Sequence, residues 1–266
     1  MKNQTLLLFL LSLLINSCLQ DDAGSAPIIE GGSDEVCTIN KSGFIESDEL
    51  WEKECIYVLN NKVVVPDGVT LTIEAGTIIK GTSGTGSLAS ALIIAQGGKI
   101  IAAGSASEQI VFTSTADNIT VGESYGSNLD QNNRGLWGGL IVLGYAPSSF
   151  AGDVDALQIE GIPAEDSLGL YGGNDPNDNS GILKYISIRH GGALIGEGNE
   201  INGLTLGGVG AGTEIDNIEV VGNVDDGIEF FGGTVDASNL LVWAQGDDAI
   251  DIDQAYSGTI DNVVVH

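Results

Sequence analysis

The sequence predicts an all-β protein, a right-handed parallel β-helix in which each coil takes about 22–24 residues. Glycine accounts for 39 of the 266 residues, whereas aromatic residues make up only 6%. Short segments recur at a nearly constant spacing, and within them apolar residues alternate with polar ones. Short alternating strands joined by Gly, Asn and Asp turns are typical of a chain that stacks coil upon coil.

Two sets of repeated segments carry this prediction. The first set has offsets of 24 and 22 residues and consists of Asn202–Leu206, Asp226–Phe230 and Asp248–Ile252. The second has offsets of 22 and 23 residues and consists of Asn217–Val220, Asn239–Val242 and Asn262–Val265. A repeat of this length cannot bury an apolar face alone, so it must stack on its neighbours. The regular leucine spacing of leucine-rich repeats is absent, which leaves the β-helix.

The aligned Asn217, Asn239 and Asn262 have a structural explanation, because Asn tolerates left-handed turns and stacked Asn side chains form an amide ladder. Upstream, strands are expected within residues 69–79, 91–101, 110–114 and 137–143. Residues 115–134 and 145–181 lack the pattern and are predicted to be loops that project from the coils. Ser47–Lys53 has the pattern of a capped helical turn.

The N-terminus has the pattern of an export signal. The apolar run Leu6–Ile15 is too short for a bilayer span of ~20 residues, and it predicts a signal peptide over residues 1–17. Leu14–Cys18 resembles a bacterial lipobox, which implies lipidation of Cys18; ordinary cleavage that leaves a free thiol is the alternative. Residues 18–36 are predicted to form a flexible tether. Within them, Gln20–Asp22 resembles the acidic surface-export signal of Bacteroidota lipoproteins, with plain linker acidity as the alternative.

Two further cysteines, Cys37 and Cys55, are expected to form a disulfide in an exported protein. A metal site is a weak alternative, because no His or additional Cys lies nearby in the sequence. Residues 37–62 are predicted to form an N-terminal cap, and residues 63–266 the β-helix. The chain stops inside a predicted strand, so we expect that the sequence is truncated at its C-terminus.

The charge of the chain excludes some partners. Its 37 acidic residues against 9 basic ones give a formal net charge of −28, which argues against nucleic acid as a partner. A hydrophobic content of 42% argues against intrinsic disorder.

Carboxylates recur in register in the last coils. Asp225 should stack on Asp247, Asp226 on Asp248, and Glu229 on Asp251, with adjacent coils ~4.8 Å apart. Like charges at this distance require a cation or raised pKa values, and oxygen-only ligands suit Ca²⁺. The candidate metal ligands are Asp225, Asp226, Glu229, Asp247, Asp248, Asp251 and Asp253. A solvated acidic face and a catalytic carboxyl pair are the alternatives.

Several segments resemble a group of bacterial secreted or lipid-anchored β-helix proteins that is common in Bacteroidota. These segments are Val69–Gly81, Gly98–Ala102, Ile110–Ser114, Arg134–Leu140 and Tyr185–Gly192. The resemblance implies the fold and an envelope location, but little about chemistry, because most of these proteins have no assigned activity.

Asn223–Ile228 and Gln245–Ile250 resemble the acidic motifs of polygalacturonase-type hydrolases. That resemblance implies Asp247 or Asp248 as general acid, with Asp226 helping to activate water. The chain departs from the pattern because Asp225 is inserted into the first motif. The later His and Arg/Lys motifs are also missing from it.

Arg189, His190 and Trp243 are candidate substrate-binding residues. Arg189 points outward on its strand and would be the base of a calcium-dependent polysaccharide lyase. Trp243 aligns with Val221 on the outward face, where an indole ring would stack on a sugar. Structural roles for His190 and Trp243 are the alternatives.

The leading interpretation is a non-catalytic lipoprotein of the cell envelope, anchored in the outer membrane through Cys18. Its β-helix would present an extended surface for glycan or protein binding, with calcium as the expected ion. The main alternative is a carbohydrate-active enzyme, either a polysaccharide hydrolase or a calcium-dependent lyase, on the same fold. A third hypothesis is an adhesin-like interaction protein that does not bind sugars.

Overall fold

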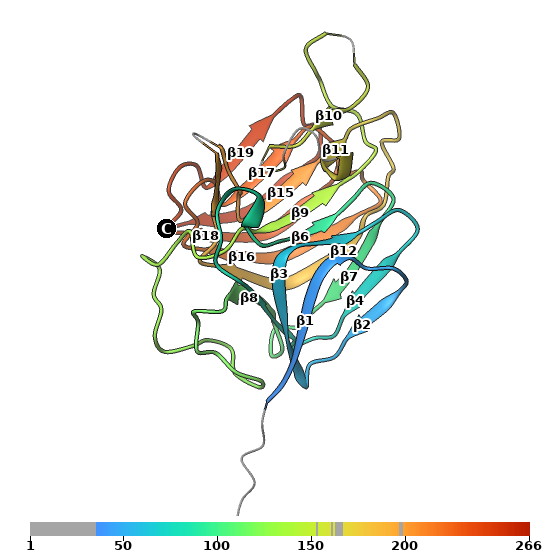
Figure 1. The fold of residues 1–266 in the computed structure, drawn as a ribbon. Helices are drawn as coiled ribbons and strands as arrows, with labels where there is room; N and C mark the ends of the chain where they lie inside the picture. The colour runs from blue at the N-terminus through green and yellow to red at the C-terminus, as the bar shows by residue number, and fades with distance from the viewer. Residues whose placement is uncertain (1–35, 153, 161, 163–166, 197–198) are drawn as a thin grey trace, which may run out of the picture. The chain divides into compact units, whose positions relative to one another are not determined.

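The computed structural model describes residues 36–266 except 153, 161, 163–166 and 197–198. Sixteen strands join into one parallel sheet that winds into coils, and this confirms the predicted right-handed parallel β-helix (Figure 1). Two small antiparallel pairs lie outside it, β10 (Leu157–Gln158) with β11 (Leu170–Tyr171) and β13 (Leu194–Gly196) with β14 (Asn199–Glu200). The helical elements of the described residues are two 3-10 turns, η1 (Gly86–Leu88) and η2 (Ser167–Gly169).

Each coil has three faces, and each face is a stack of parallel strands. Face 1 begins with β2 (Glu49–Trp51), β4 (Thr70–Ile73) and β7 (Lys99–Ala103). It continues in the first halves of β12 (Gly181–Arg189), β16 (Glu214–Val221), β18 (Ala237–Trp243) and β20 (Ile260–Val265).

Face 2 consists of the first half of β3 (Cys55–Val65), then β5 (Ile78–Gly81), β8 (Ile110–Ser114) and the second halves of β12, β16, β18 and β20. Face 3 consists of the second half of β3, followed by β6 (Ala91–Ile94), β9 (Leu140–Leu143), β15 (Leu204–Gly207), β17 (Ile228–Phe231) and β19 (Ile250–Asp253). Strand β1 (Cys37–Phe44) pairs with β3.

The corner between faces 1 and 2 is built by residues with left-handed backbone. Asn217, Asn239 and Asn262 have φ values of 56°, 57° and 56°, and each lies in the middle of its strand. The Asn262 amide donates a hydrogen bond to Oδ1 of Asn239 (3.3 Å), and the Asn239 amide donates to Oδ1 of Asp216 (2.7 Å). The left-handed turns predicted for these Asn residues are therefore confirmed, and the amide ladder is confirmed in part, because Asn239 bonds to Asp216 rather than to Asn217. Tyr185 holds the corresponding position in β12 with φ 50°.

Apolar rows fill the space between the three faces. Ile186, Ile218 and Leu240 stack in register from one coil to the next, and all three are buried. Ile228 and Phe230 point into the same core from face 3. Because the pairing is parallel and in register, each inward position meets a similar side chain in the next coil.

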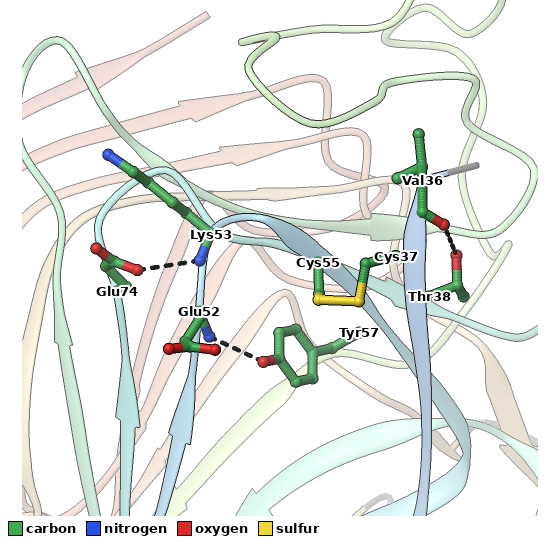
Figure 2. Close-up of a disulfide and its surroundings, with 8 residues drawn as sticks. All are labelled: Val36, Cys37, Thr38, Glu52, Lys53, Cys55, Tyr57 and Glu74. Carbon is green, nitrogen blue, oxygen red and sulfur yellow. Dashed lines mark hydrogen bonds between the residues drawn. A yellow bond between two sulfur atoms is a disulfide. The ribbon is translucent and has the colours of Figure 1, made fainter. Parts of the chain in front are cut away.

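The first coil is closed by the predicted disulfide between Cys37 and Cys55, which joins β1 to β3 (Figure 2). The helical turn expected over residues 47–53 is wrong, because β2 pairs there in parallel with β4. Trp51 in β2 is fully buried and stacks on Tyr57 with ring centroids 4.7 Å apart. The Tyr57 hydroxyl accepts a hydrogen bond from the Glu52 amide (2.8 Å, Figure 2). Burial of the indole in the first coil outweighs the local helix signal.

Among the described residues of the two predicted loops, only Gly181 at the start of β12 belongs to the long sheet, and both loops pack against the sheet rather than project freely. Residue Ile119 of the first loop is buried on the outer side of face 2 against Ile78 and Val111. Lys80 fixes this loop by donating from Nζ to the carbonyl oxygens of Asp117 (2.8 Å) and Ile119 (2.7 Å). The second loop covers face 3 in the same way, with Tyr171 buried in a second apolar cluster there.

Residues 1–35, which include Cys18, the predicted signal peptide and nearly all of the tether, lie outside the described residues. In the part of the chain that the structure describes, no helix has the length and apolarity of a membrane span.

The Asn ladder gives a first prediction. Asn239→Ala should lower the free energy of unfolding by about 1–2 kcal/mol, because alanine is strained in the left-handed region and loses the amide bonds. Asn239→Gly should lower it less, because glycine adopts this conformation without strain. Urea unfolding of both variants measures the difference. Equal losses for Ala and Gly would show that the corner depends on the amide bonds rather than on the backbone angle.

Candidate functional site

Carboxylates converge on the outer side of face 3. Glu229 in β17 and Asp251 in β19 are register partners, while their neighbours Ile228 and Ile250 face the core, as the repeat predicted. Side-chain oxygens of Asp226, Glu229 and Asp251 all lie within 4.8 Å of one another, and so do those of Asp225, Asp226 and Asp247. We refer to these five residues as the acidic cluster.

The inner part of the acidic cluster is tied to two residues that sequence reasoning missed. Asn202 is fully buried and donates from Nδ2 to Glu229 and, at 3.4 Å, to Glu160, while its Oδ1 accepts from the Asp226 amide (3.3 Å). Glu160 comes from the loop over face 3 and has no counterpart in the repeats. Asn202 did have a signal, because it aligns with Asp226 and Asp248 in the first repeat set.

Burial and mutual repulsion hold protons on this cluster. Burial raises the pKa of Glu229 to about 9, and the carboxylates of Glu160, Asp226 and Asp251 add to the rise. Burial likewise raises the pKa of Asp225 and of Asp226 to about 6, with contributions from neighbouring carboxylates. Glu160 is exposed as a whole residue, but its carboxyl faces the cluster, where burial raises its pKa. At neutral pH, Glu229 is therefore a neutral acid hydrogen-bonded to Glu160.

Two predicted metal ligands do not join the cluster. The backbone amide of Asp248 donates a hydrogen bond to Oδ1 of Asp226 (2.8 Å), and Asp248 is exposed. Asp253 is exposed at the end of β19. Of the predicted catalytic residues, Asp226 and Asp247 thus lie within the cluster and Asp248 lies at its edge. None of the five ion pairs found among the described residues involves the cluster, so its charge is balanced by protons, a bound cation or counterions from the solvent.

A second site lies on face 2, where Arg189, His190 and Trp243 line one pocket of about 400 Å³. Arg189, Val221 and Trp243 are register partners on three successive strands, which puts their side chains in one outward row. The loop that follows β8 also lines this pocket, with Asp117, Tyr125, Leu129, Asp130 and Gln131. We refer to this site as the Arg189 pocket.

Arg189 and His190 are held firmly in the wall of the pocket. The Arg189 Nε donates to Oγ of Ser187 (2.7 Å), and its Nη2 lies 3.5 Å from Glu219, which also accepts from Ser187. His190 is buried, and its Nδ1 lies 2.7 Å from the carbonyl oxygen of Asn133. A carbonyl can only accept, so Nδ1 carries the proton. Burial lowers the pKa of His190 below 6.5, so the ring is neutral at pH 7.

Tyr125 is one of the pocket residues that could not be predicted from the sequence. It is 76% exposed and lies in a loop without repeats. Trp243 is partly exposed, with its ring centroid 5.6 Å from that of His266. Together with Leu129 and Val221, these rings give the pocket apolar surfaces beside its charged groups.

The proton on Glu229 makes stability depend on pH. In the unfolded chain this carboxyl titrates near 4.5, so between about pH 4.5 and 9 the folded protein holds one more proton than the unfolded chain. The free energy of unfolding therefore falls as pH rises through this range, by at most ~1.4 kcal/mol per pH unit for one group.

Glu229→Gln should remove this dependence, because glutamine is neutral at every pH and keeps the hydrogen-bonding shape. We expect the variant to be more stable than the wild type at pH 8, with a flatter stability curve between pH 6.5 and 8.5. Urea unfolding in the presence of a chelator measures the effect, with Asp247→Asn as the exposed control from the same cluster. Parallel curves for the wild type and Glu229→Gln would contradict the assignment of the proton to Glu229.

Comparison with known proteins identifies the fold family of most of the chain. Residues 43–266 match the family model of the pectate-lyase-like β-helix domain. Searches of curated proteins and of solved structures found no match. The family match covers most of the sequence and agrees with the stacked parallel sheet. The chain therefore belongs to the pectate-lyase-like β-helix family.

Proposed function

We propose that this protein is a non-catalytic binding protein of the cell envelope that holds a glycan in the Arg189 pocket. The observation that carries the proposal is the convergence of Arg189, His190, Trp243 and Tyr125 around one pocket. Its volume of about 400 Å³ lies in the range of small-molecule sites. Aromatic faces beside hydrogen-bonding groups suit a sugar ring, which has apolar C–H faces and polar edges.

The hydrogen-bonding groups of the pocket suit recognition more than turnover. The Arg189 guanidinium is bonded to Ser187 and paired with Glu219, so it is a poor candidate for the proton-abstracting base of a lyase. The neutral His190 offers only Nε2 as an acceptor, because Nδ1 is bonded to Asn133. Both side chains are therefore fixed donors and acceptors rather than groups poised to exchange protons.

The anchoring of the protein is part of the proposal. Lipidation at Cys18, in the lipobox-like Leu14–Cys18, would fix the chain to the outer membrane. The tether of residues 18–36 would then hold the β-helix away from the lipid surface. The disulfide between Cys37 and Cys55 supports an oxidising compartment outside the cytoplasm.

Calcium is proposed as a stabilising ion at the acidic cluster. The donor set is oxygen-only and comes from Asp225, Asp226, Glu229, Asp247 and Asp251, which is the chemistry that Ca²⁺ prefers. A divalent cation would replace the protons that now relieve the repulsion among these carboxyls. This ion would stabilise the last coils.

The alternative function is hydrolysis of a polysaccharide at the acidic cluster. The observation that favours it is the contrast between Glu229, which stays protonated at neutral pH, and Asp226, which titrates near 6. Oxygens of the two carboxyls lie within 4.8 Å of each other, which is close to the ~5–5.5 Å separation of retaining glycosidases. The neutral acid would protonate the leaving oxygen while the Asp226 carboxylate attacks the sugar as nucleophile, and water would then hydrolyse the glycosyl–enzyme bond. Under this alternative, the general acid would be Glu229 rather than Asp247 or Asp248.

Glycan binding is testable through the tryptophan fluorescence of the protein. Trp51 and Trp137 are fully buried, so a change on adding ligand reports on Trp243. We expect oligosaccharides from a neutral and amino-sugar panel to change the emission. Trp243→Ala and Tyr125→Ala, followed by calorimetry, should each weaken binding about tenfold or less, the size of one aromatic contact.

The control for these variants is Phe44→Ala, which removes an exposed aromatic ring on β1, outside the pocket. Unchanged binding in both pocket variants would refute the location. Release of reducing ends from the same panel, lost in Asp226→Asn and Glu229→Gln, would instead favour the hydrolase.

Calcium binding is testable by thermal unfolding at pH 7.5. Millimolar Ca²⁺ should raise the melting temperature by several degrees over a chelator sample, because an ion that binds only the folded state stabilises it. Mg²⁺ should have a smaller effect, since it demands tighter octahedral geometry. The double variant Asp226→Asn/Asp251→Asn should lose the response. An equal shift with both ions, or none, would rule out an ordered calcium site.

A further inference from the structure

We infer that the Arg189 pocket selects a sugar unit that carries a free amino group, in preference to N-acetylated, neutral or acidic sugars. This inference rests on the glycan-binding function proposed above and specifies its ligand. It is drawn from the charge balance of the pocket, the protonation of its histidine and the placement of its aromatic rings.

The charge of the pocket is negative. Three carboxylates, Asp117, Asp130 and Glu219, line it against one guanidinium, that of Arg189. The Arg189 guanidinium is already engaged by Ser187 and Glu219, and its side chain is only 13% exposed. It is therefore poorly placed to bind a carboxylate or sulfate on a ligand.

The carboxylates differ in how far they are already satisfied. Asp117 is buried, and its carboxylate accepts hydrogen bonds from the Thr113 hydroxyl (2.9 Å) and the Ile119 amide (3.0 Å). Its carbonyl oxygen accepts a further hydrogen bond from Lys80. Asp130 is exposed, and the hydrogen bond found for its carboxylate is a local one from the Asn132 amide (2.9 Å). None of the ion pairs between described residues includes Asp130. Asp130 is thus the carboxylate available to an ammonium group.

The uncharged groups of the pocket suit a polyhydroxylated ring. With its proton on Nδ1, His190 presents Nε2 as an acceptor for a hydroxyl, and Gln131 adds an amide that can donate and accept. Tyr125 and Trp243 supply π-faces, which attract both the C–H face of a sugar and a neighbouring cation. A lysine side chain would match the carboxylate and the rings, but it would leave the hydroxyl-binding groups unused.

The net charge of the whole protein also favours an amine over an acidic ligand. A net charge of −28 attracts cations to the surface and repels polyanions. General attraction would bring any amine to the protein, so the specific role of the pocket must be separated from it. Asp130 and Asp261 are both exposed, but Asp261 lies outside the pocket on β20, and comparing the two allows this separation.

The test is a set of titrations of the full chain at about 0.15 M salt, where the Debye length is ~8 Å and distant charges are screened. The ligands are β-1,4-linked tetramers of glucosamine, N-acetylglucosamine and glucose, with lysine amide as a non-sugar amine, each followed by Trp243 fluorescence and calorimetry. We expect glucosamine tetramer to bind at least tenfold more tightly than the other three. Asp130→Asn should reduce this preference about tenfold, whereas Asp261→Asn should leave the preference unchanged.

Each contrary outcome has a distinct meaning. Equal or tighter binding of the N-acetylated or glucose tetramer would overturn the amine selectivity and leave the glycan-binding function intact. Equal losses in Asp130→Asn and Asp261→Asn would overturn it in favour of general charge attraction. Tighter binding of lysine amide than of glucosamine tetramer would overturn it in favour of a basic protein segment. No binding of any tetramer would refute the proposed function itself.

Discussion

Successive coils pair through backbone hydrogen bonds in a parallel register, and the core, the corners and both candidate sites depend on this pairing. A residue at a given position in one coil must lie about 4.8 Å from its counterpart in the next. For Ile218 and Leu240 this proximity buries apolar surface and stabilises the fold. For Glu229 and Asp251 the same proximity brings two carboxyls together, where burial raises the pKa of Glu229 and the neighbouring carboxylates, including Asp251, add to the rise.

The repeats therefore made much of the molecule predictable. The fold, the register of the last coils, the left-handed Asn corner and the disulfide all follow from residues that recur at intervals of 22–24 residues or from the cysteine count. The helical turn at residues 47–53 was wrongly expected because local capping residues carry no information about the indole that the first coil buries. Burial of Trp51 in the core determines that this segment forms a strand rather than a helical turn.

The parts of the sites that could not be predicted come from segments without repeats. Glu160 and Tyr125 reach their sites through loops whose course is set by packing against the outer faces. Nothing in the local sequence of Tyr125 shows that it lines a pocket together with Trp243, because the course of its loop is set by the burial of Ile119 and the two hydrogen bonds from Lys80. The residues on the coils were foreseeable, whereas their partners in the loops were not.

The position of the first loop has a consequence for how such a molecule acquires new surfaces. It is inserted between β8 and β9, at a corner between two faces, and β9 nevertheless stacks on β6 in the same register that β15 keeps on β9. An insertion at a corner adds residues without shifting the strands on either side of it. Binding loops of different length and composition can therefore be exchanged there without rebuilding the core, so that the scaffold and its specificity evolve, and can be engineered, separately.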